Sequence, residues 1–319
     1  MEVSSIVPYD CVIVGAGPAG ITAAIYLARK GIDVVVITLD IGGQAALSTD
    51  VENYTGYTMI PGQELVRRFE EHLEAFNIKV VYDKVKEVKK EKGLFRIKTE
   101  NNICCAKTVI IATGKKPRAL KVPGENKFIG KGITYCATCD APFFRGKPAA
   151  VIGGGNSALQ AILELSKFTK KIHVVNITSE LTGDEILKDK VKKLSFLEVH
   201  NNCKVVSVKG TKSVESIDVM STATKKKFEL KVNGVIVEIG LEPGLDLELP
   251  KDLELNEKKE IDVDQNCNTS VPGLFAAGDV ADVKWKQIIV AAGEGAKAGL
   301  SAYEYLTKSK EFLNHKYGK

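Results

Sequence analysis

The sequence predicts an α/β protein with two dinucleotide-binding units. Near the N-terminus a buried strand, a glycine-rich turn and a helix follow one another, and the same succession returns near the middle of the chain. The two turns begin at Gly15 and Gly153, about a domain's length apart, so one unit lies inside or after the other. A chain of 319 residues is long enough for two domains that each bury a core of their own.

The composition is that of a soluble globular protein, with 44% hydrophobic and 27% charged residues. The net charge of +5 is spread over many Lys and Glu without a block of one sign, which argues against nucleic acid as a partner. The longest apolar runs, such as residues 109–112, are too short to span a bilayer, and the first residues lack a signal-peptide pattern. Seven cysteines without a scaffold spacing favour a cytoplasmic location over secretion.

The first glycine-rich turn has the context that a dinucleotide site requires. Gly15 allows the tight turn, Gly17 lets backbone approach a pyrophosphate, and Gly20 lets the helix pack on the strand. The phosphates would lie at the N-terminus of the helix. The pattern consists of a buried strand at 9–14, the turn Gly15-Ala16-Gly17-Pro18-Ala19-Gly20, a helix at 21–29 and a second strand at 33–37.

The end of the second strand departs from the usual fingerprint. An acid is expected there to hold a ribose hydroxyl, but the residue is Thr38, and Asp40 comes two positions later. Asp40 is therefore the candidate for this role at a shifted position. The glycines of Gly42-Gly43-Gln44 would let backbone lie against a cofactor, although a plain turn has the same composition.

The segments that follow are interpreted mainly as core. Residues 63–76 have the spacing of an amphipathic helix, and residues 78–111 read as strands with exposed lysines. Cys104 and Cys105 fall in these strands and are expected to be structural. Ala112-Thr113-Gly114 ends a buried strand in a turn of small residues, where backbone can approach a ligand.

The second unit repeats the pattern with a strand at 149–152, the turn 153–158, a helix at 159–168 and a strand at 171–175. Recognition of the 2′-phosphate of NADP requires cations at the end of that last strand. Residues 176–182 contain no Arg or Lys. Glu180 is a late candidate for an NADH ribose.

The rest of the chain predicts a helix at 184–200, Lys-rich strands over 203–239 and a closing helix at 291–306. Residues 271–280 read as a turn and a short buried strand that ends in Gly278-Asp279. This places the Asp279 carboxylate at the carboxyl end of a strand, where ligands bind in open parallel sheets.

Between the two units lies Cys136-Ala137-Thr138-Cys139-Asp140. A Cys-x-x-Cys pair is half of a zinc site, a redox dithiol, or of no particular function. A zinc site needs a second pair of ligands, and no two histidines are three to five residues apart, so we interpret the pair as a redox dithiol. The remaining cysteines supply no second pair: Cys11, Cys104, Cys105, Cys203 and Cys267.

With these stretches in hand, the chain resembles low-molecular-weight thioredoxin reductase along essentially its whole length. The resemblance implies two Rossmann-like, three-layer ββα domains: an FAD-binding domain of residues 1–116 and 248–319, and an inserted NAD(P)-binding-like domain of residues 117–247. It also implies a homodimer that needs no metal. The matching motifs, in order, are Gly15 to Gly20, Gly42-Gly43-Gln44, Val51-Glu52-Asn53, Ala112-Thr113-Gly114, Cys136 to Asp140, Gly153 to Ala158, and Gly278-Asp279 followed by Gln287-Ile288.

The same resemblance assigns roles to site residues. Reduced flavin would pass two electrons to the Cys136–Cys139 disulfide, with Cys139 nearer the flavin as the charge-transfer thiolate. Cys136 would then attack the disulfide of thioredoxin, while Asp140 relays the proton or, as a simpler alternative, caps the next helix. Rotation of the inserted domain about residues 115–118 and 242–247 is expected. The residues implied or suggested for FAD are Gly15, Gly17, Gly20, Asp40, Gly42, Gly43, Gln44, Asn53, Thr113, Gly114, Asp279 and Gln287, with Ile288 near the flavin ring.

The electron donor is where the chain departs from the family. The family usually has His-Arg-Arg and a further Arg four residues on, where this chain has Asn176-Ile177-Thr178 and Thr182. NADPH is therefore doubtful, and the sequence favours a donor such as ferredoxin or a deazaflavin, as in some relatives, with weak NAD(P)H use as the alternative.

Other functions on the same scaffold stay open. One is an NAD(P)H-dependent disulfide reductase for another small redox protein, and another is a flavin and dithiol redox sensor without turnover. Flavin NAD(P)H oxidases and ferredoxin–NADP reductases lack the Cys-x-x-Cys pair. A flavoprotein that reduces peroxiredoxins would carry an extra N-terminal redox domain, whereas here the first strand begins at Tyr9.

Overall fold

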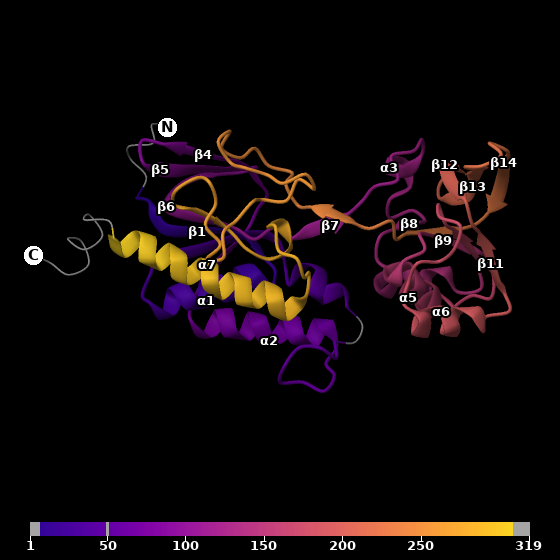
Figure 1. The fold of residues 1–319 in the computed structure, drawn as a ribbon, viewed down its shortest axis with the longest axis horizontal. Coiled ribbons are helices and arrows are strands. Elements are labelled where there is room, and N and C mark those ends of the chain that lie inside the picture. The colour runs from indigo at the N-terminus through magenta and orange to yellow at the C-terminus, as the bar shows by residue number, and fades with distance from the viewer. Residues whose placement is uncertain (1–6, 49–50, 309–319) are drawn as a thin grey trace, which may run out of the picture. The chain divides into compact units, whose positions relative to one another are not determined.

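The computed structural model describes residues 7–48 and 51–308, and the chain divides into two compact units. The first unit contains residues 1–115 and 243–319, and the second contains residues 116–242 (Figure 1). We expected the second boundary after residue 247, but Leu245 and Leu247 pack against a buried cluster of the first unit. No helix in the described ranges is long and apolar enough to cross a membrane.

The first unit is built on a seven-stranded sheet of order β3-β2-β1-β6-β5-β4, with β17 paired to β6. Parallel pairing joins β3, β2, β1, β6 and β17, while β4 and β5 are antiparallel additions. The strands are β1 (Tyr9–Ala16), β2 (Val34–Ile41), β3 (Lys79–Tyr82), β4 (Val85–Glu91), β5 (Leu94–Thr99), β6 (Ile103–Ile111) and β17 (Leu274–Ala276).

Alternate residues of β1 explain why its sequence is a continuous apolar run. Cys11 and Ile13 belong to the buried cluster that includes residues of α1 (Pro18–Arg29) and α7 (Ile288–Lys308). Val12 and Val14 belong to the cluster on the other face, which β4, β5 and residues 245–283 complete. Because both faces of the strand are covered, it has no polar side.

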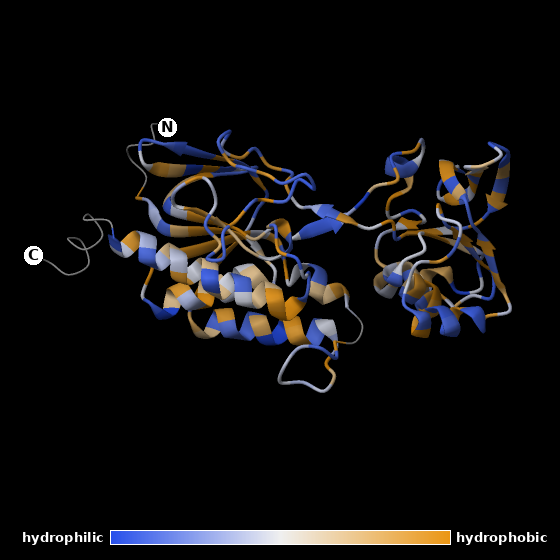
Figure 2. Cartoon of the chain, in the orientation of Figure 1, coloured by the Kyte–Doolittle hydropathy of each residue, from blue (hydrophilic) through white to orange (hydrophobic). Residues whose placement is uncertain are grey.

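The helix α2 (Gly62–Ala75) is amphipathic, as the sequence predicts. Leu65, Val66 and Leu73 are buried, whereas Arg67 and Arg68 are exposed and pair with Glu64 and Glu71. Figure 2 shows this helix alternating between hydrophobic and hydrophilic residues along its length. Two 3₁₀ turns complete the unit, η2 (Gly43–Leu47) and η4 (Gly278–Val280).

The second unit has three layers. A five-stranded parallel sheet of order β11-β10-β9-β15-β8 has α5 and α6 against one buried cluster and the antiparallel sheet β12-β13-β14 against the other. The strands are β8 (Ile133–Thr134), β9 (Ala149–Ile152), β10 (Ile172–Val175), β11 (Leu197–His200), β12 (Cys203–Gly210), β13 (Val214–Ser221), β14 (Lys227–Lys231) and β15 (Gly234–Val237). The helices are α3 (Glu125–Phe128), α4 (Ala137–Asp140), α5 (Asn156–Leu165) and α6 (Glu185–Lys192), with the 3₁₀ turn η3 (Ala141–Phe144).

The chain passes between the units twice, and the two passages pair as a small sheet. They are β7 (Lys115–Pro117) and β16 (Leu241–Pro243). Lys116 and Glu242 form an ion pair at 3.6 Å, and the Arg118 N–H donates to the Gly240 carbonyl at 3.0 Å. The predicted hinge segments therefore include this pair of strands.

One element prediction was wrong. We expected one helix over residues 184–200, but α6 ends at Lys192 and residues 197–200 form the edge strand β11. Val191 and Leu194 pack in the cluster under α5, and the chain then turns so that Leu197 pairs with Ile172. Pairing with β10 satisfies the backbone groups that a longer helix would have bonded internally.

Candidate active site

The structure contains the Cys136–Cys139 disulfide, with the two Cα atoms 5.4 Å apart. Cys136 precedes the one-turn helix α4, whose Ala137 is buried in the cluster under α5. The backbone N–H of Cys139 donates to the Cys136 sulfur at 3.2 Å, which would stabilise a thiolate on Cys136 once the disulfide is reduced. Cys139 is exposed and Cys136 is half-buried, so both sulfurs lie at the surface of the second unit.

Thr134, at the end of β8, organises the residues around the disulfide. Its hydroxyl donates to a carboxylate oxygen of Asp140 and accepts the backbone N–H of Cys136 at 3.0 Å. Asp140 precedes η3, but its side chain makes no capping hydrogen bond there. The carboxylate is thus held beside the disulfide by Thr134, and the expectation that it caps the next helix is not what the structure has.

The first glycine turn is as tight as its sequence predicts. Gly15 has φ +104°, and a Cβ there would lie 2.5 Å from the Ala112 carbonyl oxygen. A Cβ on Gly20 would lie 1.9 Å from the Gly15 carbonyl oxygen, so only glycine lets α1 pack on β1. A Cβ on Gly17 would meet no atom within 4 Å, which leaves space at the N-terminus of α1 for a ligand.

Two polar side chains follow the strands next to this turn. Thr113 comes after β6, and its hydroxyl oxygen is buried without a hydrogen-bond partner among the described residues. Asp279 comes after β17, and burial raises the pKa of its carboxyl above the ordinary value. Since β1, β6 and β17 are parallel neighbours, all three ends meet at one edge of the sheet, where the order of strands changes direction. A ligand with hydrogen-bonding groups would satisfy Thr113, so the residues present fit FAD.

Other predicted FAD residues are also brought together. The Asn53 amide donates to the Gln287 side-chain oxygen at 3.0 Å, although 234 positions separate them. Ile288 begins α7 and packs against the small cluster of Val51, Ile60 and Leu65. Gly42 has φ +90°, and Gly43 and Gln44 begin η2.

Asp40 lies at the end of β2, because this strand extends to Ile41 rather than ending at Ile37 as predicted. Its side chain is exposed, and Thr38 has a different use. The Thr38 hydroxyl accepts the Ala16 N–H at 3.1 Å and donates to the Asp40 carbonyl at 2.6 Å, which ties the ends of β1 and β2 together.

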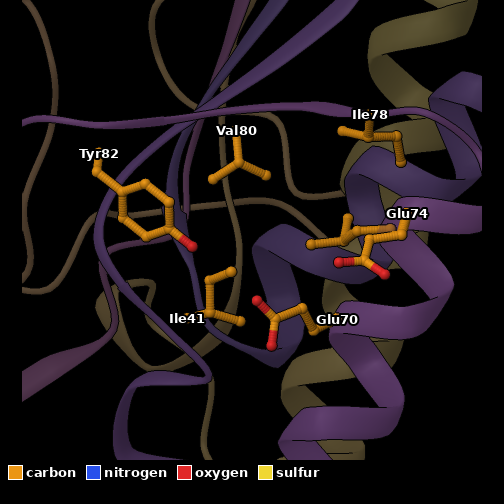
Figure 3. A pocket seen from close by; sticks show the side chains of 7 residues that line it. Ile41, Glu70, Glu74, Ile78, Val80 and Tyr82 are labelled. Atoms are coloured by element: carbon orange, nitrogen blue, oxygen red, sulfur yellow. The ribbon is translucent and has the colours of Figure 1, made fainter.

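A pocket of about 200 Å³ lies beside these residues, between α2 and the ends of β2 and β3 (Figure 3). Its walls are mainly apolar, and the carboxylates of Glu70 and Glu74 lie at its rim. Two acids so placed disfavour a phosphate group. The lining residues are Ile41, Glu70, Leu73, Glu74, Ile78, Val80 and Tyr82.

The second glycine turn is covered by its own chain. A Cβ on Gly154 would lie 2.4 Å from the Asn176 side-chain oxygen, and the Thr182 N–H donates to the Gly154 carbonyl at 2.7 Å. At the start of α5, Asn156 accepts the Asp184 N–H at 2.7 Å and donates to the Asp184 carboxylate at 3.0 Å. Residues 176–184, which we call the closing loop, therefore fold back over the turn that holds phosphates in dinucleotide-binding folds.

Asn176 secures the closing loop. Its side chain is buried and donates to the Glu180 carbonyl at 2.8 Å and to the Asn201 side chain at 3.0 Å. The Thr178 hydroxyl donates to the Asn176 side-chain oxygen at 3.0 Å. Glu180 itself is exposed.

Sequence reasoning missed Glu238, which follows β15 beside the second turn. Its backbone N–H donates to the Ile152 carbonyl at 2.8 Å, and a Cβ on Gly153 would lie 2.1 Å from its carbonyl oxygen. Burial raises the pKa of its carboxyl to about 7. The available signal was its position, since it stands at a strand end in the same way as Asp279.

Two dinucleotide-type folds and a Cys-x-x-Cys disulfide together define a two-electron disulfide oxidoreductase. The chain belongs to the pyridine nucleotide-disulphide oxidoreductase family, which matches residues 9–295. It is a flavin enzyme of the thioredoxin reductase type, since thioredoxin reductases from Lactococcus lactis (TM-score 0.86, 33% identity, 94% of this chain and 100% of that one) and T. acidophilum (TM-score 0.82, 36% identity, 93% and 98%) have its structure.

A curated relative belongs to the alkyl hydroperoxide reductase of Staphylococcus aureus and is 38% identical over 304 residues. The match covers 95% of this chain but 60% of that protein, so the chain spans less than two thirds of the relative's length. Family membership implies FAD and leaves the nucleotide preference undecided.

Proposed function

We propose that this protein is a thioredoxin reductase that reduces the disulfide of thioredoxin through Cys136 and Cys139. The observation that carries the proposal is the exposed Cys136–Cys139 disulfide with Asp140 held beside it by Thr134. The redox pair thus has an ionisable group for proton transfer next to it. Full coverage of the L. lactis enzyme supports thioredoxin as the acceptor and a homodimer as the assembly.

FAD would be held by the cradle at the edge of the first sheet, and when bound it supplies the electron pair that reduces Cys136–Cys139. Gly15, Gly17 and Gly20 would leave space for the pyrophosphate, while Thr113 would donate its free hydroxyl hydrogen. Asp279 would accept from a hydroxyl of the cofactor. The other proposed contacts are Asp40, Gly42, Gly43, Gln44, Asn53, Gly114, Gln287 and Ile288.

The thiol chemistry follows from the contacts of the cysteines. Two electrons and two protons convert the disulfide into a dithiol, and the Cys139 N–H favours the thiolate on Cys136. That thiolate attacks one sulfur of the thioredoxin disulfide, forming a mixed disulfide and releasing a thiolate on the partner, which takes up a proton. The Cys139 thiolate then attacks the Cys136 sulfur, so that reduced thioredoxin leaves and the Cys136–Cys139 disulfide returns. Asp140 exchanges protons with the two thiols during these steps.

We further propose that the electron donor is not a nicotinamide nucleotide. The closing loop occupies the second glycine turn through Thr182 and Asp184, and it lacks any cation for a 2′-phosphate. The Glu238 carboxyl stands at the same turn, where a negative charge would oppose a pyrophosphate. A reduced ferredoxin or a deazaflavin remains as the class of donor.

An anaerobic experiment tests donor and acceptor separately. The FAD-loaded protein is mixed with NADPH, then with NADH, and bleaching of the flavin absorbance is followed. We expect no bleaching by either nucleotide, bleaching by dithionite, and reoxidation by added oxidised thioredoxin. Fast bleaching by a nucleotide would overturn the donor proposal alone. Failure of thioredoxin to reoxidise the reduced protein would overturn the acceptor, and another small redox protein would then take its place.

The cysteine variants supply the control for the acceptor. Cys136→Ser and Cys139→Ser each remove one sulfur of the pair, and neither should transfer electrons from reduced flavin to thioredoxin. A Cys203→Ser variant, which changes a buried cysteine with no proposed role, should behave as the wild type.

A further inference from the structure

Three side chains that the redox chemistry does not use converge at the edge of the second unit's parallel sheet. His173 lies on β10, and Glu198 and His200 lie on the edge strand β11. The register pairs His173 with Glu198 and Val175 with His200. Because Glu198 and His200 are two residues apart on one strand, both point to the same face as His173.

The potential ligand atoms of this cluster have the spacing of a metal site. His173 Nδ1 lies 3.3 Å from His200 Nε2 and 3.1 Å from a Glu198 carboxylate oxygen, and all three atoms lie within 4.8 Å of one another. A tetrahedral zinc ion with ligands at about 2.0–2.1 Å holds neighbouring ligand atoms about 3.3 Å apart. The two measured separations therefore correspond to edges of such a tetrahedron.

Hydrogen bonds within the cluster cannot satisfy all three atoms. A ring nitrogen of a neutral histidine carries at most one hydrogen, yet His173 Nδ1 faces both the carboxylate and the second imidazole. If this nitrogen donates to Glu198, it has no lone pair to accept from His200. A cation at the centre would accept a lone pair from each of the three atoms.

The surroundings suit ligand atoms that must stay neutral and fixed. Burial lowers the pKa of His173 and of His200, against the opposing effect of Glu198, so both rings keep free lone pairs at neutral pH. The His200 ring packs against Phe228 of β14, with ring centres 5.5 Å apart. The Glu198 side chain is 60% exposed, which leaves the site open to water on that side.

We propose that His173, Glu198 and His200 bind one divalent transition-metal ion, with Zn²⁺ favoured and water as the fourth ligand. Two imidazoles and a carboxylate are ligands that zinc accepts, and a site of three protein ligands leaves one open position. The ion would join the edge strand β11 to β10. It would also secure the start of the closing loop, because the Asn176 N–H donates to the His200 carbonyl at 3.0 Å.

This site was outside what the sequence analysis expected, which was a protein without a metal. The search there was for ligands three to five residues apart along one segment, as in zinc knuckles. His173 and His200 are 27 positions apart and meet only because β10 and β11 pair in parallel.

The test is zinc binding by the full-length protein, produced without a histidine tag and with Cys136–Cys139 oxidised, since a reduced dithiol also binds zinc. After treatment with EDTA and gel filtration, Zn²⁺ is added in competition with a chromophoric chelator, and bound metal is counted by elemental analysis. We expect one Zn²⁺ per chain. Co²⁺ in its place should give the intense d–d absorption of tetrahedral coordination.

Variants identify the ligands. Glu198→Gln and His200→Gln should weaken zinc binding at least about tenfold, because even loss of an outer-shell partner of a ligand costs about 10–100-fold. His72→Gln, which changes an exposed histidine of α2, is the matched control and should bind as the wild type. Far-UV circular dichroism of each metal-free variant checks the fold, and the exposure of Glu198 makes its variant the safer one.

Less than half an equivalent of Zn²⁺ retained by the oxidised wild type would overturn the proposal. So would equal affinity of the wild type, Glu198→Gln and His200→Gln, or loss of binding in His72→Gln. None of these readouts depends on FAD, thioredoxin or the electron donor, so the result is separate from the proposed function.

Discussion

A buried carboxylate beside the proposed FAD cradle gives a prediction that can be worked out in numbers. Glu260 is 3% exposed and pairs with Lys115 at 2.8 Å and Lys286 at 3.1 Å, while Asn256 donates to it at 2.9 Å. Burial alone would raise the pKa of this carboxyl. Hydrogen bonds from Lys115, Asn256 and Lys286 outweigh burial and hold its pKa at about 2, below the ordinary value of 4.5. That difference is worth about 3 kcal/mol of folding free energy.

The variant Glu260→Gln should therefore lower the free energy of unfolding of the first unit by about 3 kcal/mol at pH 7. Because the folded pKa lies below the unfolded value, this stabilisation is complete above about pH 4.5 and is lost as the pH falls toward 2. The difference between wild type and variant should shrink to less than half at pH 3. Glu257→Gln, an exposed neighbour, should change stability little at either pH.

The assay is a urea titration at pH 7 and at pH 3. It is followed by the fluorescence of Trp285, the single Trp of the chain, which adjoins Lys286 and therefore reports on the first unit. A difference below about 1 kcal/mol at pH 7, or one of the same size at both pH values, would refute the reasoning, because the stability would then not come from an ionised Glu260.

Three further substitutions test single contacts of the site. Thr134→Val removes the hydroxyl that holds Asp140, and thioredoxin turnover should fall about tenfold with FAD content unchanged, since a hydrogen bond to a charged group is worth about 1.5–3 kcal/mol; an unchanged rate would contradict this role. Thr113→Val removes the buried hydroxyl without a partner, so titration of the apoprotein should show FAD affinity about tenfold weaker while its melting temperature does not decrease; a lower melting temperature would mean that the hydroxyl supports the fold instead. Gly20→Ala places a Cβ 1.9 Å from the Gly15 carbonyl oxygen, so the protein should purify without FAD absorbance, whereas Gly293→Ala, where a Cβ meets nothing within 4 Å, should keep it; a yellow Gly20→Ala protein would refute the close packing of α1 on β1.

The parts of the account that the sequence could predict are local in the chain. A glycine between a strand and a helix has one conformation compatible with close packing, so Gly15 and Gly20 could be identified from their neighbours alone. The disulfide of Cys136 and Cys139 also spans only three positions. In each case the spacing along the chain is enough to specify the geometry.

The parts that could not be predicted depend on which strands are neighbours. Asn53 reaches Gln287, and His173 reaches His200, because of the order and register of strands and helices that no segment encodes by itself. Asn176 illustrates the same limit. The sequence shows that the 2′-phosphate cations are missing at this position, but only the structure shows that its amide binds the closing loop over the second glycine turn.

The central claim is that Cys136 exchanges disulfides with thioredoxin, and trapping the mixed disulfide tests it most directly. Reduced Cys139→Ser protein is mixed with oxidised thioredoxin, and the covalent adduct is isolated and mapped by mass spectrometry. The account predicts a stable disulfide between Cys136 and one thioredoxin cysteine, because Cys139 is no longer present to release it. No adduct, or an adduct formed equally well by Cys136→Ser through Cys139, would contradict the account.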